Sequence, residues 1–188
     1  GKVFLAEVDT HSVHAVDLTS GKRLWTYTAG GAVDSPPTHH NGRVYFGSVD
    51  GRIYCLDAAT GKSVWRFLAA PADRRMVYYD RLESIWPVHG SVLLHEGSLW
   101  AAAGRSSYLD GGIALWRLDP ETGEVQAHSR LSHEGVETGL GDELKPGNRM
   151  IGALNDILSA GDDASMFMRH NQFDASFEKI EPDWHIYN

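Results

Sequence analysis

The 188-residue chain contains a single cysteine, Cys55, which excludes an internal disulfide and a C-x-x-C-H haem attachment. It has no apolar run of membrane-spanning length and no basic stripe of the kind that binds nucleic acid. It also lacks a G-x-S-x-G nucleophile elbow. We therefore expect no membrane span and no nucleic-acid partner, and we expect Cys55 to be a small buried hydrophobe.

What the chain does contain is a repeat. VHAVDLTSGKRLW ends at Trp25, and IYCLDAATGKSVW ends 40 residues later at Trp65. A third copy, IALWRLDPETGEV, carries Asp119 and Gly123 but has Ala127 where the tryptophan would fall. A period of this length is typical of repeat architectures.

Each copy reads as a strand, a turn and a returning strand. The aspartate can accept backbone N–H groups of the turn, the glycine can take a positive φ, and the indole can reach a neighbouring unit. A hairpin with a surface tryptophan is the alternative, which two copies in register disfavour. The residues predicted to dock one unit onto the next are Asp17, Gly21, Trp25, Asp57, Gly61, Trp65, Asp119 and Gly123.

Further alternating segments lie upstream of each turn, and Asn41-Gly42 and Asp50-Gly51 divide them as hairpin turns do. Four short antiparallel strands in roughly 40 to 45 residues make one propeller blade. The predicted fold class is all-β, a partial β-propeller of about three and a half four-stranded antiparallel blades.

The motifs AVDLTSGKRLW and CLDAATGKSVW resemble the tryptophan-docking motif of the pyrroloquinoline-quinone-like (PQQ-like) β-propeller repeat family. Longer stretches, such as DSPPTHHNGRVYFGSVDGRIYCLDAATGKSVWRF, look like large propeller proteins exported by bacteria. The resemblance implies a propeller and a periplasmic or extracellular location. It carries over no catalytic residue, so none is predicted.

The repeats divide the chain into six predicted parts. These are a partial blade I (1–30), blade II (31–70), an insertion loop (71–86), blade III (87–132), an acidic loop (133–149) and a degenerate blade IV (150–188). Closed propellers use roughly four to eight blades, so we expect a piece of a larger ring. Residues 171–188 show no turn register.

The family resemblance also raises the possibility of a quinoprotein dehydrogenase, in which a ring of about eight blades holds PQQ with Ca²⁺ on its axis. The chain lacks the adjacent-cysteine pair of many such enzymes. We therefore expect no cofactor for this chain alone, with PQQ and Ca²⁺ conceivable only if the full ring is a dehydrogenase. The prediction leans against an enzyme.

Two segments could hold a ligand. The insertion PADRRMVYYDRLESIW offers Arg74, Arg75 and Tyr79 as a polar lid, or else forms a solvated strap between blades. The loop GRSSYLDGG offers Arg105, Ser106 and Asp110 as ligand-binding residues, with the arginine and the hydroxyl as an anion or sugar clamp. In the alternative reading of that loop, Arg105 pairs with Asp110 and orders its own hairpin.

No metal site is predicted. The ten histidines show no H-x-H pair, and adjacent strand residues such as His39 and His40 point to opposite faces. The acidic segment 134–149 lacks the D-x-D-x-D spacing of a calcium loop.

The sequence favours a non-catalytic binding or scaffolding platform in an exported bacterial protein. Its partners would be the remaining blades of the same propeller, or a protein or glycan. A fragment of a PQQ- and Ca²⁺-dependent dehydrogenase is the first alternative. A propeller that accompanies a carbohydrate-active catalytic domain is the second.

Overall fold

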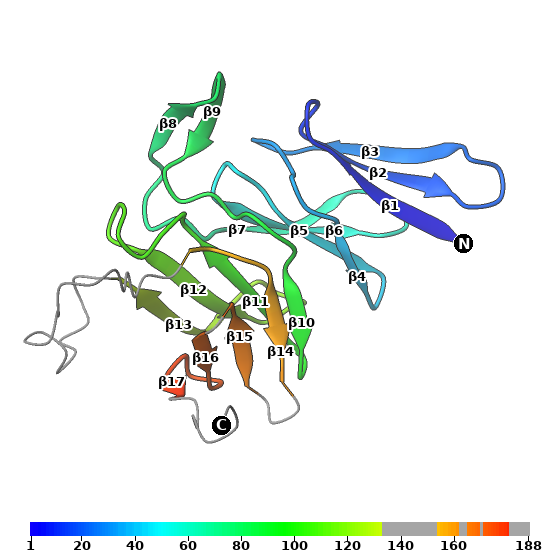
Figure 1. Cartoon of the computed structure of the whole chain (residues 1–188). Coiled ribbons are helices and arrows are strands. Elements are labelled where there is room, and N and C mark those ends of the chain that lie inside the picture. The colour runs from blue at the N-terminus through cyan, green and yellow to red at the C-terminus, as the bar shows by residue number, and fades with distance from the viewer. Residues whose placement is uncertain (133–153, 162–164, 170, 181–188) are drawn as a thin grey trace, which may run out of the picture.

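The computed structural model describes residues 1–132, 154–161, 165–169 and 171–180. The regular elements of this part of the chain are all β-strands, and they form four antiparallel blade sheets in chain order, with a two-stranded sheet between the second and third (Figure 1). The prediction of an all-β propeller fold is confirmed. No helix in the described ranges is long and apolar enough to cross a membrane.

Each sheet is a meander in which every strand pairs with its neighbour in the chain. Blade I has three strands: β1 (Lys2–Glu7), β2 (Ser12–Asp17) and β3 (Arg23–Thr28). Blade II has four: β4 (Thr38–His40), β5 (Arg43–Gly47), β6 (Arg52–Asp57) and β7 (Ser63–Leu68).

Blades III and IV repeat the four-stranded pattern. Blade III consists of β10 (Leu93–His95), β11 (Ser98–Ala103), β12 (Ile113–Leu118) and β13 (Val125–Leu131). Blade IV consists of β14 (Leu158–Ala160), β15 (Met166–Met168), β16 (Asn171–Phe173) and β17 (Lys179–Ile180). The predicted acidic loop, 133–149, lies outside the described residues.

The hydrophobic core lies between the blades. Val44 and Phe46 of β5 are fully buried against blade I, while Tyr45 on the opposite face is buried against blade III. A strand with both faces covered needs apolar residues at every position, which explains the run Val44-Tyr45-Phe46. A separate cluster that includes Trp100 and Met166 joins blade III to blade IV.

The meander sorts the connections between two ends of the sheets, because antiparallel strands reverse direction at each turn. One end carries the Asp-Gly turns that join the last two strands of blades I, II and III. The other end, here called the linker face, carries the connections between blades and the loops that join β1 to β2, β5 to β6 and β11 to β12. Those segments are 29–37, 69–92, 8–11, 48–51 and 104–112.

The insertion between blades II and III is not the irregular loop that the sequence predicts. Within it, β8 (Arg75–Tyr78) and β9 (Arg81–Ser84) form a hairpin that projects from the sheets (Figure 1). Its turn residues, Tyr79 and Asp80, have φ of 46° and 64°, as a type I′ turn requires. The hairpin is hard to recognise in sequence because this turn contains no glycine.

Candidate functional site

The Asp-Gly turn of blade II is held by its own aspartate. Asp57 Oδ1 accepts hydrogen bonds from the backbone N–H and the hydroxyl of Thr60, at 2.8 and 2.7 Å. These two bonds, the hydroxyl first, hold the pKa of Asp57 below its ordinary value. Gly61 closes the turn with a φ of 72°. The turn is therefore a rigid unit of five residues.

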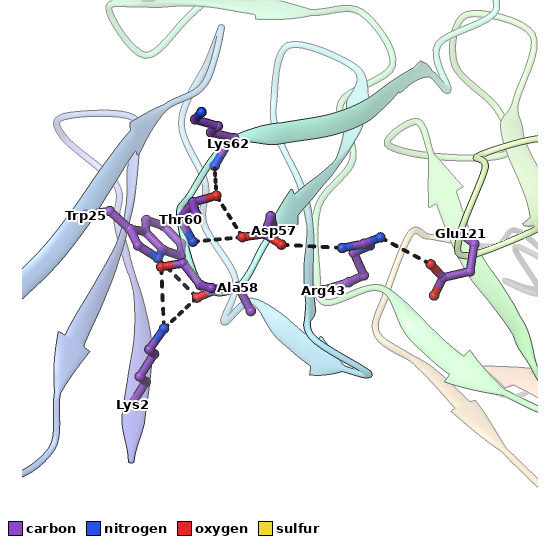
Figure 2. Close-up of polar contacts among 9 residues, drawn as sticks. Lys2, Trp25, Arg43, Asp57, Ala58, Thr60, Lys62 and Glu121 are labelled. Atoms are coloured by element: carbon purple, nitrogen blue, oxygen red, sulfur yellow. Dashed lines mark hydrogen bonds and ion pairs between the residues drawn. The ribbon is translucent and has the colours of Figure 1, made fainter.

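The two repeat tryptophans lie on the turn of the following blade. Trp25 covers Gly61 and donates its indole N–H to the Ala58 carbonyl at 3.2 Å (Figure 2). Trp65 covers Gly123 and donates to the Pro120 carbonyl at 3.0 Å. In both junctions the acceptor is the residue that follows the turn aspartate. The indoles thus join blade I to blade II, and blade II to blade III.

A basic side chain reinforces both junctions, which the sequence analysis missed. Lys2 donates to the Ala58 carbonyl at 3.1 Å, beside the indole. Arg43 of β5 lies between Asp57 and Glu121, 3.5 Å from each carboxylate, and so connects the turns of blades II and III (Figure 2). Lys2 and Arg43 occupy the same place in their sheets, since each pairs with its blade's turn aspartate.

Blade III has Ala127 at the position of the repeat tryptophan, and it contacts blade IV through a different side chain. Arg117 donates to the Ala175 carbonyl at 3.3 Å. Ala175 follows Asp174, whose Oδ1 accepts the N–H groups of Ser176 and Glu178. A fourth, shortened copy of the aspartate turn is therefore present in a segment where the sequence showed no turn register. The first residue after each turn aspartate again provides the acceptor.

Arg105 attaches the β8–β9 hairpin to blade III. Its guanidinium lies 2.5 Å from Glu83, donates to the carbonyls of Ser84 and Ile85 at 3.2 Å each, and stacks 4.6 Å from the centre of the Tyr78 ring. The structure thus pairs Arg105 with Glu83, and the alternative of a pair with Asp110 is wrong. These contacts use three of the five N–H donors of Arg105 and pair its charge with Glu83, so Arg105 holds the hairpin to blade III.

Three further ion pairs hold the hairpin at its tip and at its base. Arg81 lies 2.9 Å from Asp9 in the loop between β1 and β2, so the tip of the hairpin reaches blade I. At its base, Asp73 pairs with Arg52 at 3.1 Å and with Arg75 at 3.7 Å. The hairpin is therefore attached to blades I, II and III on the linker face.

The other predicted ligand residues are divided between the surface and the interior. Arg74 and Tyr79 are exposed on the hairpin, Tyr79 at 84%. Ser106 is buried, and its hydroxyl accepts the N–H of Tyr108. Asp110 uses its backbone carbonyl to accept the Trp86 indole N–H at 3.0 Å. The structure brings the two predicted segments together through Arg105 and Glu83.

The hairpin exposes an unusual amount of apolar surface for an element with so many charges. Val77 is 73% exposed, its cross-strand partner Leu82 is 55% exposed, and Tyr79 in the turn is 84% exposed. Met76 and Tyr78 of β8 are partly exposed on the opposite face of the hairpin, where Tyr78 stacks on Arg105. Exposed apolar clusters on a protein surface commonly mark sites of interaction. We refer to Val77, Tyr79 and Leu82 as the hairpin patch.

The described residues do not fit a Ca²⁺-bound quinone. No three His, Cys, Asp or Glu side chains converge in the described ranges as metal ligands would. The first strands of the complete blades, β4, β10 and β14, contribute Thr-His-His, Leu-Leu-His and Leu-Ser-Ala, without a carboxylate. No reaction step through such a group is derived for this part of the chain.

Known proteins resemble the chain in sequence. The dehydrogenase subunit of a quinone-type alcohol dehydrogenase from Komagataeibacter europaeus is 31% identical over 134 residues, which cover 65% of this chain and 18% of that protein. A 1-butanol dehydrogenase (cytochrome c) from Thauera butanivorans is 44% identical over 64 residues, 28% of this chain and 9% of that one. The chain thus spans less than a fifth of the length of either relative.

Solved structures share the fold. BamB from Moraxella catarrhalis superposes with a TM-score of 0.60 at 19% identity, over 96% of this chain and 48% of that one. The quinohemoprotein alcohol dehydrogenase from Comamonas testosteroni gives 0.54 at 24% identity, over 69% of this chain and 19% of that one. The family model described as outer membrane protein assembly factor BamB matches residues 1–145. The chain therefore belongs to this family of PQQ-like β-propeller repeats.

Proposed function

We propose that the chain is a non-catalytic scaffold segment of an exported bacterial propeller protein, and that its hairpin patch binds a protein partner. The observation that carries this proposal is the combination of exposed apolar side chains with a rigid attachment. Val77, Tyr79 and Leu82 face solvent on a hairpin that ion pairs hold to blades I, II and III. A preorganised apolar surface loses little conformational entropy when it binds.

Two further points support this function. Apolar and aromatic side chains, tyrosine in particular, are enriched at the centres of protein interfaces. The family description, an outer membrane assembly factor, supports both a protein partner and a location outside the cytoplasm. The remaining blades of a propeller, or a glycan, are the other partners we consider.

A photo-crosslinker placed at Tyr79 tests the proposal in a bacterial envelope extract. We expect a discrete adduct that an excess of the unmodified chain suppresses and that an excess of the Val77→Asp/Leu82→Asp variant does not. The matched control places the crosslinker at Val64, which is 42% exposed on β7 of blade II. Equal adducts at both positions, or none at Tyr79, would contradict the proposal.

A segment of a quinone-dependent alcohol dehydrogenase is the second candidate. It is favoured by the 31% identity over 134 residues to such a dehydrogenase subunit. The purified chain can be titrated with PQQ and Ca²⁺ while quinone absorbance and dye-linked oxidation of 1-butanol are followed. Saturable quinone binding with alcohol oxidation would replace the scaffold proposal with this one. We expect neither signal from the chain alone.

A further inference from the structure

The strand β8 pairs with β9 alone in the part of the chain that the structure describes, so one of its edges has no neighbouring strand. All four residues of β8 are exposed, whereas Glu83 and Ser84 of β9 are buried. The hairpin also stands away from the blades (Figure 1). An uncovered strand edge presents unpaired N–H and C=O groups to any second extended chain.

The register of the hairpin shows which main-chain groups point outward. Tyr78 and Arg81 flank the two-residue turn and form a hydrogen-bonded pair, and hydrogen-bonded and non-hydrogen-bonded pairs alternate from there. Val77 and Leu82 are therefore a non-hydrogen-bonded pair, whose N–H and C=O groups point away from each other's strand. Arg75, two residues before Val77, directs its main chain to the same open side of β8.

The two edges of the hairpin differ in what covers them. On the β9 edge, the Ser84 N–H donates to the Val49 carbonyl at 2.7 Å, so the loop after β5 already occupies the base of that edge. On the β8 edge, no hydrogen bond from another segment of the described ranges reaches the main chain of Arg75 or Val77. The open edge is therefore that of β8, and it borders the hairpin patch because Val77 belongs to both.

The solvent face of the hairpin indicates which side chains a third strand would bring. The alternation of β8 places Arg75 and Val77 on this face with Leu82, while Tyr78 on the opposite face stacks on Arg105. A strand added at the β8 edge sets one side chain beside Val77 and another, two residues away, beside Arg75. An apolar residue suits the first place, because it buries apolar surface against Val77.

The charges at the base of β8 favour an acidic residue in the second place. Asp73 is shared by Arg52 and Arg75, at 3.1 and 3.7 Å, and the exposed Arg74 forms no ion pair with a carboxylate of the described residues. Three arginines thus have one carboxylate between them, in a chain whose net charge is −8. The β8 strand of a second copy carries no carboxylate, so it does not meet this requirement.

We propose that the β8 edge binds an extended segment of a protein partner as a third, antiparallel strand, with an apolar residue against Val77 and an acidic residue two positions later against Arg75. This inference rests on the proposed function, since it states how the hairpin holds a protein. The main chains of Arg75 and Val77 exchange hydrogen bonds with the segment, and the two side chains select its sequence. Antiparallel pairing is the commoner arrangement of neighbouring strands.

A synthetic peptide, Ac-TTVTETT-NH₂, tests this pairing on the intact chain, because its valine and glutamate have the required spacing. We expect saturable shifts of the Arg75 and Val77 amide signals, with slower hydrogen exchange at both amides. A matched peptide with an N-methylated valine keeps every side chain but cannot donate to the Val77 carbonyl, and it should not bind. Equal binding of these two peptides, or no shift with either, would overturn the strand pairing.

A third peptide, Ac-TTVTKTT-NH₂, tests the acidic position separately from the main chain. It should bind roughly threefold more weakly than the glutamate peptide, as expected for one exposed ion pair. Arg75→Glu should reverse the order of the two peptides. If Arg75→Glu leaves their order unchanged, Arg75 does not select the acidic residue.

Proline substitutions compare the two edges of the same hairpin. Val77→Pro removes an N–H that points outward and makes no bond within the hairpin, and Leu82→Pro makes the same change on the β9 edge. The ring signals of Tyr78, which stacks on Arg105, check that the hairpin stays folded. With the photo-crosslinker at Tyr79, the adduct from envelope extract should be lost in Val77→Pro and persist in Leu82→Pro.

The outcomes separate this inference from the proposed function. Loss in both proline variants, or persistence in both, would rule out pairing at the β8 edge while a partner of the hairpin remained. Absence of any adduct from the chain without these substitutions would instead count against the proposed function itself.

Discussion

Trp25 covers Gly61 so closely that a Cβ on this glycine would lie 2.6 Å from the indole. Both residues belong to the repeat motif, but Trp25 lies in blade I and Gly61 in blade II. Their contact therefore joins the two sheets. The glycine is required twice over: its φ of 72° favours glycine, and the ring leaves no room for a side chain.

The substitution Gly61→Asn should therefore destabilise the chain by about 2 kcal/mol, because asparagine tolerates the positive φ but collides with Trp25. Gly21→Asn is the matched control, with a similar φ of 67° and no described neighbour within 4 Å. It should cost under about 1 kcal/mol. Urea unfolding of both variants measures the difference, and equal losses would show that backbone strain alone explains the glycines.

The pair between Arg105 and Glu83 is the most buried ion pair of the hairpin, with side chains 15% and 8% exposed. Glu83→Gln should leave a guanidinium without its counter-charge and cost about 3 kcal/mol of local stability. Hydrogen exchange of the β9 amides should accelerate accordingly. The control is Asp73→Asn in a half-exposed pair, which should cost less than about 1 kcal/mol. Similar exchange in both variants would argue against Arg105 as the main attachment.

The turn aspartates predict a loss of stability in acid. The pKa of Asp17 is lowered mainly by the hydrogen bond it accepts from the backbone N–H of Ser20. The pKa of Asp57 is lowered mainly by the hydrogen bond it accepts from the hydroxyl of Thr60. Both pKa values therefore lie below the unfolded value of about 3.9. A lowered folded-state pKa stabilises the chain above about pH 4, and this contribution disappears as the pH falls through the folded-state pKa.

Asp57→Asn should flatten the decline of the unfolding free energy between about pH 4 and pH 2, because asparagine keeps an acceptor oxygen but does not titrate. Urea unfolding at several pH values measures the slope. Asp9→Asn is a suitable comparison, since Asp9 lies in an exposed pair with Arg81 outside the turns. If Asp57→Asn leaves the slope unchanged, the turn hydrogen bonds do not control the acid sensitivity.

Cys55 should report global unfolding. Burial raises the pKa of its thiol to about 12, and the side chain has no exposed surface in the core between blades II and III. Reaction with an aromatic disulfide reagent at neutral pH should therefore be slow in the native chain and rapid in urea, because the thiolate is the nucleophile. A fast reaction without denaturant would mean that the junction opens locally.

The sequence predicts best what the chain determines locally. The Asp57 turn is complete within five residues, so the residue order alone predicts the turn, the conformation of its glycine and the reversal of the next strand. The period of 40 residues then predicts stacked blades. The hairpin of residues 75–84 was missed because Tyr79 and Asp80 adopt positive φ without a glycine to signal it.

Contacts between distant segments could not be predicted from single motifs. Arg105 and Glu83 are 22 residues apart in separate loops, and only the fold brings them to 2.5 Å. The fourth turn was missed for a related reason: its left-handed residue is Phe177, with a φ of 66°, where the other turns have glycine. The side chain that donates to this turn is Arg117, whereas the repeat motif predicts a tryptophan.

At every junction the accepting oxygen belongs to the main chain, at Ala58, Pro120 and Ala175, while the donor changes from indole to guanidinium. A carbonyl cannot be removed by point mutation, so a substitution at the accepting residue leaves the acceptor in place. A gene duplication that adds one unit brings its acceptor with it. Rings of different size can therefore evolve by recombination, without paired changes at two sites.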